Sequence, residues 1–247
     1  MHIRVINPNT SVAMTRSIGA AARDAVSPSS RVSAAHPTMG PASIESHYEE
    51  ALAVPGLLEQ ISVGEREGVD AFVIACFGDP GLDAARELAT VPVVGIAEAA
   101  FHAAAFVARR FGVVTTLGRT TGRARELVDR YGFGSACTVI RACEIPVLAL
   151  DDPASSARRA VADECRLVLD SGAEAIVLGC AGMADLCHEL TVELGVPVVD
   201  GVRAGAAFAE SLARLGLSSG ARGEYAAPPE KGFSGLLSGF SLAGPSA

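Results

Sequence analysis

The chain contains 247 residues, of which 49% are hydrophobic and 19% charged, and its formal net charge at pH 7 is −8. A chain of this length and composition can bury a substantial core, and its acidic balance excludes the basic surface typical of nucleic-acid-binding proteins. No apolar stretch reaches the length of a membrane helix, and a strand-like run begins at once without a signal-peptide pattern. We therefore expect a soluble, cytoplasmic protein that binds neither nucleic acid nor membranes.

The predicted elements are mostly short apolar strands in alternation with helical patterns. Continuous apolar runs are typical of strands covered on both faces, as in parallel sheets. Their alternation with helices predicts an α/β fold with right-handed crossovers. In chain order we expect a strand that ends at Ile6, helices at 12–26 and 44–61, a strand at 71–75, a helix at 82–88, a strand at 91–96, a helix at 97–109, a strand at 113–116, helices at 121–131 and 154–169, a strand at 175–178, a helix at 183–194, a strand at 196–199 and a helix at 203–215.

The second half of the chain repeats the first. An apolar run, a cysteine, a glycine turn, a helical pattern and a Val-Pro-Val-Val stretch occur in this order around Cys76 and again around Cys180, 104 residues later. We therefore predict two pseudo-symmetric lobes with parallel sheets and an active site in the cleft between them. The predicted N-terminal lobe comprises residues 1–98 and 200–231, and the C-terminal lobe comprises 99–199. We expect the Gly/Ser-rich tail, 232–247, to be loosely ordered.

Cys76 and Cys180 each follow an apolar strand directly and precede a helix. Ligands of parallel sheets bind beyond the carboxyl ends of the strands, and a helix N-terminus lowers the pKa of a nearby thiol. Gly78 and Gly182, two residues further on, free backbone N–H groups that suit an oxyanion. A single cysteine at such a place is more often a buried packing residue, but a symmetric pair favours proton removal by one thiol and proton delivery by the other.

The remaining cysteines have no mirrored partner, and we expect them to pack in the interior. Without a Cys-x-x-Cys pattern or a secretion signal, all six cysteines are predicted to be thiols rather than disulfides. A zinc site built from Cys180, Cys187 and His188 is a weak alternative, because helical spacing places Cys180 before the helix and the other two along it. The unmirrored cysteines are Cys137, Cys143, Cys165 and Cys187.

Polar residues follow the strand that opens each half. Asn9 follows the first strand, and Thr115 and Thr116 end its counterpart, so these side chains are candidates to line the cleft. Helix capping is the alternative for them, and for Ser43 capping and ligand contact are equally supported. Asp79 stands three residues after its cysteine and the corresponding aspartate of the second copy five, so no shared catalytic role is predicted.

Taken together, these motifs resemble the hydantoin and allantoin racemases of the aspartate/glutamate racemase superfamily. The resemblance covers about residues 2–231, and the two cysteine motifs together are its most specific part. It rests on Ile6-Asn7-Pro8-Asn9-Thr10-Ser11, Pro41-Ala42-Ser43-Ile44-Glu45, Ala75-Cys76-Phe77-Gly78-Asp79-Pro80-Gly81-Leu82, Val113-Val114-Thr115-Thr116-Leu117 and Leu178-Gly179-Cys180-Ala181-Gly182-Met183-Ala184-Asp185-Leu186.

The resemblance implies cofactor-independent racemisation of a 5-substituted hydantoin or of allantoin, without a metal, by a homo-oligomer. Cys76 and Cys180 match the two catalytic cysteines of the family. The amino-acid racemases of the superfamily carry Cys-Asn-Thr where this chain has Cys76-Phe77-Gly78, so free glutamate or aspartate is a doubtful substrate. The resemblance further implies that the substrate contacts Asn9, Ser43, Phe77, Gly78, Thr115, Thr116, Ala181 and Gly182.

Three alternatives remain open at this point. An arylmalonate-type decarboxylase of the same superfamily needs protonation on one face only, and the presence of two matched thiols disfavours it. A maleate-type cis–trans isomerase can also carry two cysteines and is disfavoured less. A two-lobed, non-catalytic metabolite-binding protein would explain the symmetry but not the thiols.

Overall fold

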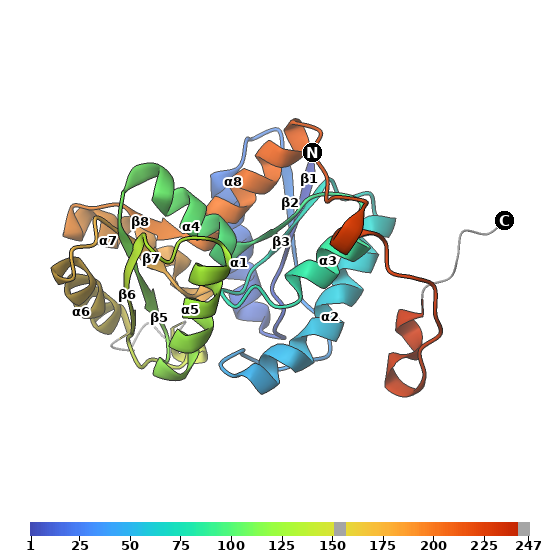
Figure 1. The fold of residues 1–247 in the computed structure, drawn as a ribbon, viewed down its shortest axis with the longest axis horizontal. Coiled ribbons are helices and arrows are strands. Elements are labelled where there is room, and N and C mark those ends of the chain that lie inside the picture. The colour runs from blue at the N-terminus through green and yellow to red at the C-terminus, as the bar shows by residue number, and fades with distance from the viewer. Residues whose placement is uncertain (151–156, 242–247) are drawn as a thin grey trace.

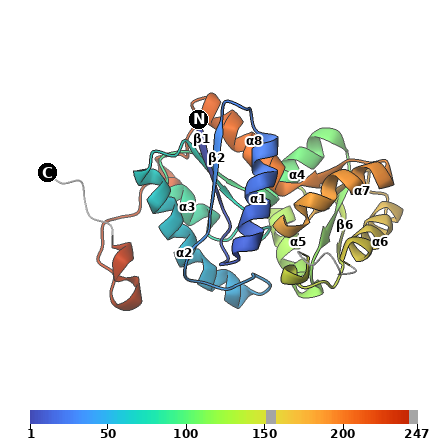
Figure 2. The same ribbon diagram turned by 180° about the vertical axis from the view of Figure 1, so that it is seen from behind.

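The computed structural model describes residues 1–150 and 157–241, and within them the chain forms two four-stranded sheets (Figures 1 and 2). The first sheet consists of β1 (His2–Ile6), β2 (Arg31–Ala35), β3 (Ala71–Ile74) and β4 (Val93–Gly95), and the second of β5 (Phe111–Thr115), β6 (Cys137–Ala142), β7 (Ala175–Leu178) and β8 (Val198–Asp200). The helices are α1 (Val12–Ala25), α2 (His47–Arg66), α3 (Leu82–Leu88), α4 (Ile96–Val107), α5 (Thr121–Arg130), α6 (Ala157–Asp170), α7 (Cys187–Leu194) and α8 (Gly201–Arg214), with 3-10 turns η1 (Gly118–Thr120), η2 (Val147–Ala149), η3 (Ala181–Leu186), η4 (Gly223–Tyr225) and η5 (Gly235–Phe240).

Both sheets have the same strand order, β2-β1-β3-β4 in the first and β6-β5-β7-β8 in the second, and their paired strands are parallel. Every residue of the inner strands β3 and β7 is buried, because helices cover both faces of each sheet. This double cover is why their sequences are continuously apolar. The predicted α/β fold of two pseudo-symmetric parallel sheets is confirmed.

The sequence analysis missed the edge strands β2 and β6. Both have mainly half-buried side chains and include polar residues such as Ser33 and Arg141, so neither shows the continuous apolar run of an inner strand. The pattern that revealed the inner strands was therefore absent from these two segments. The other two edge strands, β4 and β8, are more deeply buried and keep their apolar runs, so the sequence predicted them.

Helices α4 and α8 connect the two halves of the fold. Although α4 follows a strand of the first sheet, it packs on the second, where Phe101 stacks on Phe111 with ring centroids 5.7 Å apart. In the same way α8, which follows the last strand of the second sheet, packs on the first sheet, where Val202 and Val73 belong to one cluster of buried apolar side chains. We propose that one lobe comprises residues 1–98 and 200–231 and that the other comprises residues 99–199. The limits between the two lobes fall near the N-termini of α4 and α8.

Two predicted helices begin three or four residues later in the structure. Ser46, rather than Ser43, caps α2, since Ser46 Oγ accepts a hydrogen bond from Glu49 N (3.3 Å) in a Ser-x-x-Glu pattern. The helix predicted at 183–194 is divided into the 3-10 turn η3 and α7. The helix predicted at 154–169 is α6, and its first three predicted residues lie outside the described part of the chain.

The segment predicted to be a loosely ordered tail is described only as far as Ser241. From Gly232 to Ser241 almost all of its residues are exposed, and Figure 1 shows η5 apart from the two sheets. Residues 242–247 of the predicted tail lie outside the described residues. Among the helices that are described, none is both long and apolar enough to span a membrane.

Candidate active site

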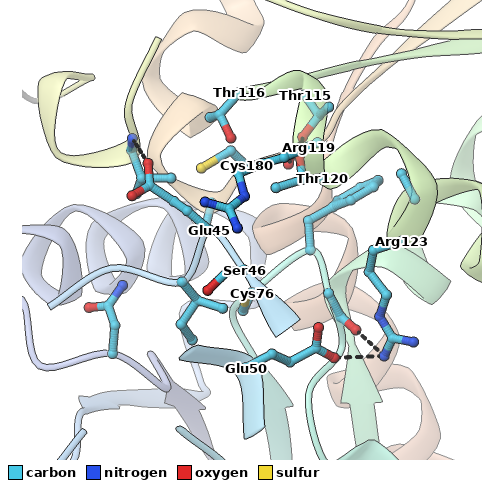
Figure 3. Close-up of a pocket in the computed structure, with 18 of the residues that line it drawn as sticks. Glu45, Ser46, Glu50, Cys76, Thr115, Thr116, Arg119, Thr120, Arg123 and Cys180 are labelled. Carbon is cyan, nitrogen blue, oxygen red and sulfur yellow. Dashed lines mark hydrogen bonds and ion pairs between the residues drawn. The ribbon is translucent and has the colours of Figure 1, made fainter. Parts of the chain in front are cut away.

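A pocket of about 200 Å³ opens where the carboxyl ends of the two sheets face each other (Figure 3). Residues that follow β1, β3 and β7 line it, represented by Asn9, Cys76 and Cys180, together with Thr116 just after β5. The strand register explains this convergence, because β1 and β3 end at paired residues and β5 ends one residue beyond its last pair with β7, Val114 with Leu178. The pocket is the crevice in which ligands of parallel sheets bind.

The two cysteines occupy equivalent backbone turns. Asp79 N donates to the carbonyl of Cys76 (2.9 Å), and Met183 N donates to the carbonyl of Cys180 (3.1 Å). Each turn therefore closes three residues after its cysteine, as the repeat in the sequence predicts. Both cysteines line the same pocket, and each residue is partly exposed, although the sulfur of Cys76 itself lies out of water.

Several hydrogen-bond donors surround the two thiols. Ala181 and Gly182 are the first residues of η3, so their N–H groups precede the first intrahelical hydrogen bond. In the other turn the N–H of Gly78 points at the sulfur of Cys76. The hydroxyl of Thr116 has no hydrogen-bond partner among residues 1–150 and 157–241 and points into the pocket (Figure 3). Such donors suit a substrate whose oxygen becomes negatively charged.

Burial controls the ionisation of Cys76. Removal from water raises the pKa of this thiol to about 12, and the N–H of Gly78 opposes the shift. The nearby Cys180 and Glu50 raise the Cys76 pKa further. The expected lowering by a helix N-terminus does not hold at Cys76, because α3 begins only at Leu82, after Gly81, and its N-terminus is not at the sulfur. In the free protein Cys76 is thus a neutral thiol at pH 7.

The structure brings most of the predicted site residues together. Ser43 lies outside the lining, and its hydroxyl donates to Glu45 Oε2 (3.0 Å). Gly182 also lies behind the lining, where a Cβ would approach Leu150 to 3.1 Å. The predicted residues that do line the pocket are Asn9, Cys76, Phe77, Gly78, Thr115, Thr116, Cys180 and Ala181.

Sequence analysis missed the charged residues of the lining, which connect the two halves. Arg123 lies 2.8 Å from Glu50 Oε1 and donates to the carbonyl of Gly78 (2.9 Å). On the other side of the pocket Val147 N donates to Glu45 Oε1 (2.7 Å). Figure 3 shows both connections at the rim of the pocket. No local pattern links residues so far apart in the chain, so only the folded structure reveals them.

Comparison with known proteins identifies the family. Residues 3–209 match the family model described as Asp/Glu/Hydantoin racemase. The chain belongs to this family. It is 48% identical to the hydantoin racemase of Pseudomonas sp. (strain NS671), with 97% of each chain covered. Its structure is similar to that of the allantoin racemase from Klebsiella pneumoniae, with a TM-score of 0.95, 51% identity, and 98% and 99% of the two chains covered.

The chain is therefore an isomerase, and more narrowly a racemase. More distant structures share only its fold. An arylmalonate decarboxylase is 18% identical, with a TM-score of 0.64, and the match covers 91% of this chain and 97% of the other. The maleate isomerase of Pseudomonas putida S16 is 21% identical, also with a TM-score of 0.64, and the match covers 88% of this chain and 93% of the other. At this level of identity the likeness extends to the sheets and helices and not to the chemistry.

Asp79, for which no shared catalytic role was predicted, anchors the Cys76 turn of the racemase. Its buried carboxylate accepts hydrogen bonds from Ala97 N and Glu98 N (both 3.0 Å) and from the hydroxyl of Tyr131 (2.8 Å). Burial raises the pKa of Asp79 to about 7, although these three donors oppose the shift. The carboxylate occupies the space beside Gly95, where a Cβ would lie 2.4 Å from Asp79 Cγ.

The other cysteines of the racemase are thiols as well. None of the six forms a disulfide. Cys187 donates to the carbonyl of Val198 with a sulfur–oxygen distance of 2.7 Å, and Cys165 is fully buried in the core of the second lobe. In the described part of the chain, no group of three or more His, Cys, Asp or Glu side chains is arranged to hold a metal ion.

Proposed function

We propose that this racemase interconverts the enantiomers of 5-substituted hydantoins, allantoin among them, by proton transfer between C5 and the thiols of Cys76 and Cys180. The observation that carries the proposal is that two thiols in equivalent turns of two equivalent sheets line one pocket. The names of its relatives, hydantoin racemase at 48% identity and allantoin racemase at 51%, support the substrate class.

The chemistry matches the pair of thiols. A ring carbonyl adjoins C5 of a hydantoin, so removal of the C5 proton leaves an enolate. One thiolate takes this proton from one face, and the thiol on the opposite face gives its own proton to C5. The C–H bonding electrons enter the enolate and return to form the new C–H bond. After one turnover the two sulfurs have exchanged protonation states, and the opposite enantiomer is the matching substrate.

The ionisation of Cys76 assigns the first roles in this scheme. Since its pKa is raised to about 12, Cys76 is the proton donor of the free enzyme. Cys180 is then the base for the enantiomer whose C5 proton faces it. The N–H groups at the start of η3 and the hydroxyl of Thr116 are donors for the enolate oxygen. The scheme requires neither a metal nor an organic cofactor.

Serine substitution of each thiol tests the proposal. Cys76→Ser and Cys180→Ser should each lower the racemisation rate of enantiopure allantoin, followed by polarimetry, by at least about a hundredfold, because each turnover needs both an acid and a base. Cys187→Ser is the matched control, since Cys187 lies outside the pocket lining and serine can still donate to Val198. A folded Cys180→Ser protein that retains more than about a tenth of the activity would contradict the two-thiol scheme.

A further inference from the structure

Arg119 is a charged side chain of the pocket for which the scheme above has no use. It lies in η1, directly after β5, and belongs to the pocket lining although much of its surface is exposed. Figure 3 shows its guanidinium extended into the pocket, away from Arg123. Within the described residues this guanidinium forms neither a hydrogen bond nor an ion pair.

The other charged side chains of the lining, Glu45 before α2, Glu50 on α2 and Arg123 on α5, are already engaged. Arg123 is held by Glu50 and by the carbonyl of Gly78. Glu45 accepts hydrogen bonds from Val147 N and from the hydroxyl of Ser43. Arg119 therefore presents a guanidinium that none of the described residues engages, next to the site of reaction.

The orientation of a bound ring follows from where the donors are placed. The thiols and the turn N–H groups lie at the carboxyl ends of β3 and β7, so a ring that reacts there places its carbonyls among these donors. Arg119 approaches from the exposed side of the pocket, where the substituent on C5 would lead outward. A guanidinium is a planar set of N–H donors that pairs with carbonyl or carboxylate oxygens, often through two parallel hydrogen bonds.

We propose that Arg119 is a specificity-determining residue that selects hydantoins whose 5-substituent carries a hydrogen-bond acceptor, such as a ureido carbonyl, a carboxamide or a carboxylate. This inference rests on the proposed hydantoin racemisation. It assigns Arg119 to substrate selection rather than to proton transfer, because a guanidinium stays protonated at neutral pH and cannot act as a base. Substrates with a purely apolar 5-substituent gain nothing from Arg119.

The test measures kcat and KM of the wild type, Arg119→Met and Arg119→Lys with allantoin and with 5-benzylhydantoin. Loss of a hydrogen bond to a charged group should lower kcat/KM for allantoin in Arg119→Met about tenfold to a hundredfold, mainly through KM. With 5-benzylhydantoin, kcat/KM should change less than about threefold, since no such hydrogen bond is lost. Arg119→Lys should fall between, because lysine keeps the charge without the planar fork.

Arg159→Met is the matched control. Arg159 is exposed on α6 and outside the pocket lining, so its loss changes the net charge equally. Equal losses with both substrates would overturn the proposal and give Arg119 a role at the ring or in folding. Unchanged kinetics with allantoin would overturn it as well. Failure of the proposed function itself is distinguishable, since the wild type would then racemise neither compound.

Discussion

Helices α4 and α8 occupy equivalent positions after the last strand of each sheet, yet they obtain their N-terminal carboxylate from different places. At α8 it comes from Asp200 at the end of β8, which accepts from Val202 N (2.8 Å) and Arg203 N (3.3 Å). At α4 the equivalent residue is Gly95, which has no side chain to accept, and Asp79 of the Cys76 turn caps the helix instead.

The two cysteine turns also differ in the interactions that hold them. The third residue after Cys76 is the polar Asp79, and the third residue after Cys180 is Met183, which is fully buried among the apolar side chains of the second lobe. One turn is therefore fixed by hydrogen bonds from the start of α4 and from Tyr131 of the other lobe, and the other turn by apolar packing. Equivalent backbone geometry at the two cysteines does not require equivalent interactions.

The largest loss of stability is expected when Met183, the buried apolar residue of the Cys180 turn, is truncated. Met183→Ala leaves a cavity in a fully buried site and should lower the free energy of unfolding by about 2–5 kcal/mol. Because Met183 closes the Cys180 turn, kcat should also fall by about tenfold or more through misplacement of the thiol. Urea denaturation and polarimetry measure the two effects. Met183→Leu should cost less than about 1.5 kcal/mol, and an equal loss in this variant would argue against packing as the cause.

Removal of either helix cap should cost less stability, and only removal of the Asp79 cap should also lower kcat. Asp79→Ala removes the partner of two amides and of Tyr131 and should cost about 2–4 kcal/mol, with a lower kcat because the Cys76 turn loosens. Asp200→Ala should cost about 1–2 kcal/mol and leave kcat within about twofold. The same drop of kcat in folded samples of both variants would show that Asp79 has no special connection to Cys76.

The smallest effect is a pH dependence of stability at the Asp79 cap. The Asp79 carboxyl has a pKa of about 7 in the folded protein against an ordinary value of 3.8. Between these values the unfolded chain releases the proton while the folded protein keeps it, so this contribution to stability is present at low pH and is lost as the pH rises towards 7. Above that pH it changes no further.

Asp79→Asn isolates this contribution. The free energy of unfolding, measured in urea at pH 5 and pH 8, should fall more for the wild type than for Asp79→Asn, because asparagine does not titrate. Asp200→Asn makes the same measurement at the other helix cap, since burial also raises the pKa of Asp200. An identical pH dependence of the wild type and Asp79→Asn would place the Asp79 pKa near its ordinary value.

Much of the fold could be predicted because burial leaves a local trace in the sequence. The inner strands β3 and β7 are covered on both faces and therefore read as unbroken apolar runs, and the repeat around Cys76 and Cys180 reveals the symmetry. The edge strand β2 leaves no such trace. The capping of α2 by Ser46 depends on one side-chain contact, which helical periodicity does not encode.

The parts of the site that could not be predicted depend on contacts across the two lobes. Glu50 and Arg123 lie on different helices and meet only after folding, so neither stands out in its local sequence. Asp79 shows why spacing alone misleads. Its counterpart in the second half is found at the end of β8, as Asp200, and not in the cysteine turn. A comparison of the turns by sequence therefore assigns Asp79 no partner.

The transfer of the C5 proton by two separate thiols is the central claim, and isotope labelling tests it most directly. In deuterium oxide, with one pure enantiomer of allantoin, one thiol removes the C5 proton and the other delivers a deuteron from solvent. Early product should carry deuterium at C5 while recovered substrate remains largely protiated, as measured by mass spectrometry after separation of the enantiomers and subtraction of the uncatalysed exchange. Early product that is mostly protiated would show that one base serves both faces, which would contradict the pairing of Cys76 with Cys180.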